Sequence, residues 1–290
     1  MSEVAAASSG KSHKDENFPV ASVIAPRYRA PVLAFYNFVR AADDVADHAT
    51  LPPEKKLALL EELALALTGQ GPSDPVAEPL KRMLAEHRIT DRHALDLIEA
   101  FKLDVTKNRY GDFDDLIDYC RLSAMPVGRY VLDVHGESRD TWAASDKLCA
   151  ALQIINHLQD CGKDFRSLDR VYLPADTLAA HGAHVDMLGA DRASPELRAV
   201  IVDLARRTQG LLAESAVFPS QVRDTRLAMN VAAIQKLAEK LTEGLLARDP
   251  LSEKVHASRA GFLLTALGAA GAVLARRILP FGSPARTHGA

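Results

Sequence analysis

Apolar residues recur every three or four positions along most of the chain, and this spacing predicts amphipathic helices. No clear series of strand-like segments, alternating apolar and polar residues between turn signals, stands out in the sequence. The helices are expected over 31–48, 53–67, 76–86, 90–108, 114–134, 145–162, 195–214, 220–247 and 260–275. We therefore predict an all-α, single-domain protein in which these helices form one bundle.

Proline and glycine positions refine the expected helix ends. Pro31 suits the first turn of its helix, where a missing N–H leaves no intrahelical hydrogen bond unmade. Pro126 lies inside the helix over 114–134, so we expect a kink at that point. Gly162 is expected to end the helix that begins near Ser145.

The segment 36–47 has polar residues at positions that a buried helix face would give to apolar ones. Tyr36, Arg40, Asp43 and Asp47 follow at steps of four, three and four residues, which places them on one helical face. Two carboxylates stacked in this way repel each other, and they do so more strongly when they are desolvated. We expect a divalent cation beside them.

A second segment repeats this arrangement more than a hundred residues later. Gln153, Asn156, Asp160 and Asp164 again share one helical face. If the two helices face each other, four carboxylates converge, and a ligand set of oxygen atoms without His or Cys favours Mg²⁺. Because Mg²⁺ sites are usually completed by phosphate oxygens of the substrate, the expected ligand is a diphosphate.

A solvated acidic helix face is the alternative interpretation of either motif. A single Asp-x-x-x-Asp pair would favour that alternative. The first motif, however, lies among Phe35, Phe38 and Val39, and the second is flanked by Ile154 and Ile155. Two pairs in such apolar segments favour the metal site.

Composition and charge narrow the class of protein. The chain has 290 residues, a 48% hydrophobic content and a net charge of -3, without a basic tract, so a nucleic-acid partner is not expected. Cys120, Cys149 and Cys161 form neither a Cys-x-x-Cys motif nor an even set for disulfides, which is typical of the cytoplasm. Residues 1–15 lack an apolar signal region, and we expect a disordered leader there.

The C-terminal part of the chain, 251–280, contains an apolar, Gly- and Ala-rich stretch over 260–275. It is shorter than the roughly 20 residues that a membrane-spanning helix needs. We expect a helix packed on the domain, with a helix that docks on a membrane surface as the second interpretation. A tail over 281–290 follows.

The sequence resembles the squalene/phytoene synthase family, through both acidic motifs and through Arg170-Val-Tyr172-Leu-Pro174. It is more narrowly similar to the hydroxysqualene synthases of the bacterial hopanoid pathway over 16–22, 35–48 and 119–128. One departure from the family lies at 123–128, where carotenoid-forming members usually have a Val-Ala-Gly-like run. This departure argues against formation of phytoene.

The resemblance implies an isoprenoid-synthase-type helical bundle around a central apolar cavity, with the catalytic domain over 16–250. It implies that Asp43, Asp47, Asp160 and Asp164 bind Mg²⁺ and act in catalysis, and that Tyr119 lies near the reacting carbons. The residues expected to bind substrate are Phe18, Tyr36, Arg40, Ser123, Val127, Gln153, Asn156, Arg170 and Tyr172. For Ser123 and its small neighbours, close helix packing is the alternative role.

The activity implied by the resemblance is Mg²⁺-dependent conversion of presqualene diphosphate and water to hydroxysqualene and diphosphate, without NADPH. Condensation of two farnesyl diphosphates to presqualene diphosphate or squalene is the alternative within the family. A catalytically silent, lipid-binding relative is the alternative outside enzymes. The expected partners are the substrate, a presqualene diphosphate synthase that hands it over, and the inner face of the membrane.

Overall fold

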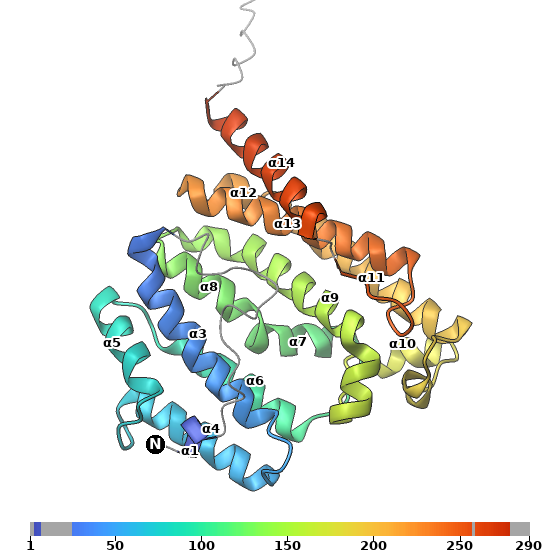
Figure 1. Ribbon diagram of the computed structural model, residues 1–290, viewed down its shortest axis with the longest axis horizontal. Helices are drawn as coiled ribbons and strands as arrows, with labels where there is room; N and C mark the ends of the chain where they lie inside the picture. Colours follow the sequence, from blue (N-terminus) through green and yellow to red (C-terminus); the bar gives the residue numbers. More distant parts are fainter. Residues whose placement is uncertain (1–2, 7–24, 257–258, 279–290) are drawn as a thin grey trace, which may run out of the picture.

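The computed structural model describes residues 3–6, 25–256 and 259–278. Over these residues the chain forms helices and no strands, so the predicted all-α fold is confirmed (Figure 1). The helices are α1 Glu3–Ala6, α3 Pro26–Ala46, α4 Pro53–Thr68, α5 Ala77–His87, α6 Arg92–Thr106, α7 Phe113–Ser123, α8 Met125–Val134, η1 Arg139–Thr141, α9 Trp142–Leu168, α10 Ala175–Ala180, η2 Val185–Gly189, α11 Pro195–Ser215, α12 Phe218–Gln221, α13 Thr225–Ala247 and α14 Arg259–Ile278.

Two groups of buried apolar side chains hold the helices together. One group lies among α3, α4, α5 and α6, and the other surrounds α9, which packs against α7, α8, α11 and α13 (Figure 1). Tyr130 of α8 links α8 to α3, because its ring stacks on Phe35 with centroids 3.9 Å apart. Its hydroxyl donates a hydrogen bond to the backbone oxygen of Pro31, at 2.9 Å. Burial of these apolar surfaces is the main force that fixes α3 and α9 in place.

Helix α3 begins earlier than predicted. Pro26 occupies its first turn, and Pro31 lies inside the helix rather than at its start. A proline in the first turn leaves no hydrogen bond unmade, so Pro26 suits that position. The sequence prediction for Pro31 was therefore wrong by about one turn of helix.

The predicted kinked helix over 114–134 is in fact two helices. Helix α7 ends at Ser123, α8 begins at Met125, and Ala124 between them leaves the helical region with φ -126° and ψ -47°. Pro126 lies in the first turn of α8. A proline stops the preceding helix and is tolerated at the start of the next, which explains why a break replaces the kink.

Helix α9 runs through Gly162 to Leu168, so the prediction that Gly162 ends this helix was wrong. A Cβ at Gly162 would lie 3.1 Å from Nη1 of Arg166 and 3.4 Å from the backbone oxygen of Leu188. The glycine therefore permits close packing of η2 against α9. Asp169 caps the C-terminus of the helix, and its φ of 51° lies in the left-handed region.

Helix α14 packs along α13, as the first interpretation of the C-terminal stretch predicted (Figure 1). The Arg277 guanidinium donates to the backbone oxygens of Val222 and Arg223, so the end of α14 lies beside the start of α13. Leu267 nevertheless exposes 62% of its surface. No helix among the described residues is both long enough and apolar enough to cross a membrane.

The predicted disordered leader includes one helical turn, α1. Val4 of this turn is buried in the apolar group beside α3, and Glu3 pairs with Lys55 of α4. The prediction of disorder was therefore wrong for Glu3–Ala6. The rest of 1–15 lies outside the described residues.

Candidate active site

The two acidic motifs lie at the C-terminal ends of α3 and α9, and Arg170 connects them. Arg170 follows α9 and is buried, and its Nη1 lies 2.6 Å from Oδ1 of Asp47, the residue that caps α3. The charge of Asp47 also contributes to raising the pKa of Asp164. The fold therefore brings the two distant motifs to one place.

The first acidic pair is partly neutralised by arginines. Nη1 of Arg40 lies 2.9 Å from Oδ2 of Asp43, and Nη2 of Arg40 lies 3.0 Å from Oδ1 of the buried Asp44. Burial, followed by the charge of Asp47, raises the pKa of Asp43 to about 7. A carboxyl group with such a pKa is held in a position that disfavours its negative charge, and a nearby cation would favour that charge.

The second acidic pair has no arginine partner. Among the described residues, neither Asp160 nor Asp164 has a side-chain hydrogen bond or an ion pair. Burial, followed by the charge of Asp160, raises the pKa of Asp164 to about 6. The charges of Lys163 and Arg170 only partly offset this rise, and the carboxylate oxygens are ligands that suit a hard cation such as Mg²⁺.

No three His, Cys, Asp or Glu side chains of the described chain are grouped closely enough to hold one metal ion between them. Proteins usually bind Mg²⁺ through one or two carboxylates, with waters and substrate phosphates completing the octahedron. Two separate carboxylate pairs fit that mode of binding. The assignment of the four aspartates to Mg²⁺ stays a prediction.

A buried carboxylate lies beside Arg170. Nε of Arg170 donates to the backbone oxygen of Asp104, at 3.1 Å. The Tyr119 hydroxyl lies 3.0 Å from both carboxylate oxygens of Asp104, and the Tyr172 hydroxyl donates to Oδ1 at 2.9 Å. Burial raises the pKa of Asp104 to about 6, against the opposing charge of Arg170 and the two hydroxyl donors. Tyr119 and Tyr172, both predicted site residues, therefore meet at one carboxylate.

Asp104 was not among the predicted site residues. The sequence shows it as one acidic residue in an amphipathic helix, where a solvated position is as common as a functional one. The carboxylate of Asp104 is covered by Tyr119 and Tyr172, which come from other parts of the chain. A contact between residues so distant in the sequence cannot be predicted from the local pattern.

His157 is the second site residue that the sequence prediction missed. Its ring stacks on Tyr172 with centroids 3.5 Å apart, and its Nε2 lies 3.1 Å from Nε2 of Gln153. Asn156, its neighbour and a predicted substrate-binding residue, is exposed, and its role stays a prediction. The sequence held the signal, because Gln153, His157, Asp160 and Asp164 also follow at steps of four, three and four residues.

The other predicted substrate residues are less closely tied to the aspartates. Tyr36 is half-buried on α3. The buried hydroxyl of Ser123, at the end of α7, has no partner among the described residues, and Val127 of α8 is 40% exposed. Phe18 lies outside the described residues. The substrate-binding roles of these residues stay predictions.

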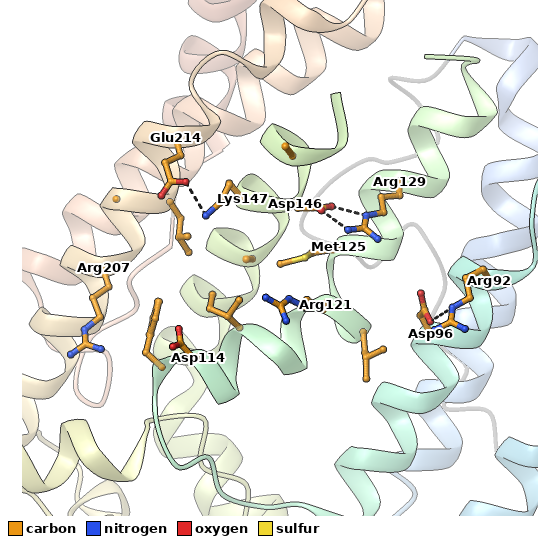
Figure 2. Close-up of a pocket in the computed structure, with 17 residues that line it drawn as sticks. Arg92, Asp96, Asp114, Arg121, Met125, Arg129, Asp146, Lys147, Arg207 and Glu214 are labelled. Carbon is orange, nitrogen blue, oxygen red and sulfur yellow. Dashed lines mark hydrogen bonds and ion pairs between the residues drawn. The ribbon is translucent and has the colours of Figure 1, made fainter. Parts of the chain in front are cut away.

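A wide pocket of about 760 Å³ lies among α6, α7, α8, α9 and α11, and Figure 2 shows its lining. It contains none of the predicted site residues. Its labelled charges are largely paired with one another, as the dashed lines show: Arg92 with Asp96, Arg129 with Asp146, and Lys147 with Glu214. The carboxylate site therefore lies apart from this pocket.

Comparison with known proteins places these residues in a family context. Residues 11–260 match the model of the squalene/phytoene synthase family. A hydroxysqualene synthase of Rhodopseudomonas palustris is 52% identical over 97% of this chain and 96% of its own. A hydroxysqualene synthase of Sinorhizobium fredii is 51% identical over 95% of this chain and 94% of its own.

Solved structures give the same picture of the fold. A squalene synthase from Alicyclobacillus acidocaldarius has a TM-score of 0.66 and 30% identity, over 92% of this chain and 90% of its own. A dehydrosqualene synthase has a TM-score of 0.76 over 94% of this chain and 97% of its own, and at 22% identity it speaks for the fold alone. The helical bundle is therefore of the squalene-synthase type.

Proposed function

The chain belongs to the squalene/phytoene synthase family, and on that premise we propose that it converts presqualene diphosphate and water into hydroxysqualene and diphosphate. Two relatives named hydroxysqualene synthase support this proposal, because they are 52% and 51% identical over nearly the whole chain. One observation within the structure carries the proposal. Arg170 contacts Asp47 of the first acidic pair and the backbone of the buried Asp104, and the charges of Arg170 and Asp47 both act on Asp164 of the second pair.

The acidic pairs supply the binding site for the diphosphate end of the substrate. Mg²⁺, when bound, supplies positive charge that neutralises the diphosphate and stabilises it as a leaving group. Asp43 and Asp47 would hold Mg²⁺ on the side of α3, and Asp160 and Asp164 would hold Mg²⁺ on the side of α9. Arg170 orients Asp47 through the 2.6 Å contact between Nη1 and Oδ1. Arg40 orients Asp43 in the same way.

The aromatic group beneath the carboxylates suits the positive charge that remains on the hydrocarbon. When the bond between carbon and the diphosphate oxygen breaks, the substrate becomes a cyclopropylcarbinyl cation. The ring of Tyr119 and the negative charge of the Asp104 carboxylate stabilise such a cation electrostatically. The oxygen of water then bonds to the rearranged cation, and the departed diphosphate takes the proton that water loses.

We also propose a peripheral contact with the membrane, because a thirty-carbon substrate and product are too apolar for free diffusion through water. Residues 16–250 would form the catalytic unit, and α14 would approach the lipid surface. Leu267 and Leu274 of α14 are 62% and 39% exposed, as an interfacial contact requires. Flotation with phospholipid vesicles tests this contact, and a protein that stays with the aqueous fraction would contradict it.

Product analysis tests the proposed activity. The purified full chain is incubated with Mg²⁺ and either presqualene diphosphate or farnesyl diphosphate, each with and without NADPH. We expect hydroxysqualene from the first substrate in both conditions, and no product from the second. Coupling of farnesyl diphosphate would replace the proposal by the condensation reaction, and a dependence on NADPH would replace it by squalene formation.

A further inference from the structure

We propose that Nδ1 of His157 holds the water molecule that captures the carbocation, and that Gln153 is a positioning residue that fixes the tautomer of His157. This inference rests on the proposed function, and it assigns a role to a buried histidine that the ionisation step does not use. His157 packs between two tyrosines of the site, with its ring centroid 3.5 Å from that of Tyr172 and 5.9 Å from that of Tyr119. The imidazole of His157 is a polar group among aromatic rings, so we expect a polar molecule to bind beside it.

The hydrogen bond between the two side chains determines which of their atoms remain available. Nε2 of Gln153 donates to Nε2 of His157, at 3.1 Å, so the imidazole proton lies on Nδ1 when the amide has this orientation. Oε1 of Gln153 and Nδ1 of His157 have no partner within the described part of the chain. Nε2 and Nδ1 lie on opposite sides of the imidazole, so the Nδ1–H donor points away from Gln153 and is the group left for a water molecule. Gln153 acts by fixing the tautomer that carries this donor.

The imidazole is neutral, as a water-holding role requires. Burial, followed by the charge of Arg170, lowers the pKa of His157 to about 3. A neutral ring adds no positive charge beside the carbocation, whereas an imidazolium would repel it. The ring can still donate from Nδ1 and leave one lone pair of the water free to attack.

The position along α9 matches the site of the proposed reaction. His157 precedes Asp160 by three residues, which is about 4.5 Å of helix rise, and Gln153 lies about 6 Å further along. The positive charge of an ionised presqualene diphosphate stays within a few carbon atoms of the departing group. Water held by His157 is therefore near the cation and within about one helical turn of the acidic pair that would bind the departing diphosphate.

The capture step is balanced without another reactant. The water oxygen gives an electron pair to the cationic carbon and forms the C–O bond. The resulting oxonium loses one proton to the diphosphate that has left. Gln153 and His157 end the step in the protonation state in which they began it.

The ratio of products tests the inference, because every product arises from the same cation after ionisation. We compare His157→Phe and Gln153→Leu with the wild-type chain, supplied with Mg²⁺ and presqualene diphosphate. We expect the ratio of hydroxysqualene to hydrocarbons formed by proton loss to fall about tenfold in each variant, or about 1.4 kcal/mol between two barriers. His157→Gln keeps a hydrogen-bonding group and should restore part of the ratio.

His93→Phe is the matched control, because His93 is also buried and touches aromatic rings, Tyr130 and Trp142. Its loss should lower stability without changing the product ratio. The inference is overturned if both test variants keep the wild-type ratio, or if His93→Phe shifts it equally. If the wild-type chain itself makes no hydroxysqualene, the proposed function fails first, and that result is read before any variant is made.

Discussion

The two acidic pairs of the site have similar spacing in the sequence but different surroundings in the fold. Arg40 contacts Asp43, and Arg170 contacts Asp47, so each carboxylate of the first pair has a cationic partner. Within the described residues, Asp160 and Asp164 of the second pair form no ion pair, although the charges of Lys163 and Arg170 act to lower the pKa of Asp164. The two pairs therefore differ in their ion pairs, although burial and the charge of Asp47 still raise the pKa of Asp43 to about 7.

The difference suggests that α3 and α9 contribute differently to the binding of Mg²⁺. A carboxylate held by an arginine is fixed in position, so it orients a bound ion more than it attracts one. A partly buried carboxylate without a partner costs free energy until a cation arrives. The second pair should therefore contribute more to the affinity for Mg²⁺, and the first pair more to its placement.

The largest expected effect is loss of turnover when either pair is neutralised. Asp43→Asn and Asp160→Asn should each lower the rate of diphosphate release by about 10³-fold, because a ligand of the cation that stabilises the leaving group is lost. Helicity measured by circular dichroism should not change.

Asp118→Asn is the control for this experiment, since Asp118 is exposed and its one ion pair among the described residues is with Arg121, three positions further along α7. It should keep wild-type turnover. Titration with Mg²⁺ and a substrate analogue separates the two pairs. Asp160→Asn should weaken binding of the ion more than Asp43→Asn does, and equal effects would remove the proposed difference.

The next effect concerns Arg170, through which the two motifs meet. Arg170→Ala removes the partner of Asp47 and the donor to the Asp104 backbone, and leaves both groups in a partly buried place. We expect the free energy of unfolding to fall by about 2–3 kcal/mol. Urea unfolding measures this value.

Arg170→Lys separates charge from geometry. Lysine keeps the positive charge but cannot make the two directed contacts of the guanidinium, so we expect an intermediate loss. Equal stability of the lysine variant and the wild-type chain would show that charge alone holds the two motifs together.

The sequence predicted the all-α fold and the shared helical face of each acidic pair because both depend on regular spacing. Helical periodicity is visible over a few residues, and the steps between Asp43 and Asp47, or Asp160 and Asp164, follow directly from it. Their convergence was inferred from charge, since four unpaired carboxylates in apolar helices need a common cation. The contact of Arg170 with Asp47 agrees with that reasoning.

The sequence did not predict contacts that depend on tertiary structure. Asp104 is recognised only when Tyr119 and Tyr172 reach it from other segments. His157 and Asn156 are neighbours, and both fit the helical spacing, so only the direction of α9 decides which one is buried. Gly162 was interpreted as a helix end because the backbone that crowds it, at Leu188, is distant in the sequence.

The smallest expected effect distinguishes the two pairs by stability in the absence of metal. Burial and the charge of Asp160 raise the pKa of Asp164 in the folded chain to about 6, above its ordinary value of 3.8. A carboxyl group with a raised folded pKa destabilises the fold when it is ionised. This cost is absent below pH 3.8, grows as the pH rises, and is complete above about pH 6.

Asp164→Asn should therefore stabilise the metal-free protein at pH 8, by about 1 kcal/mol after allowance for solvent screening, and should have little effect at pH 4. Asp47→Asn should not stabilise it at either pH, because the substitution removes the charge that Arg170 contacts. Thermal unfolding at both pH values, with a chelator present, measures the difference. If the two variants behaved alike, the unpaired state of the second pair would have no energetic consequence, and the contrast between the motifs would be one of geometry only.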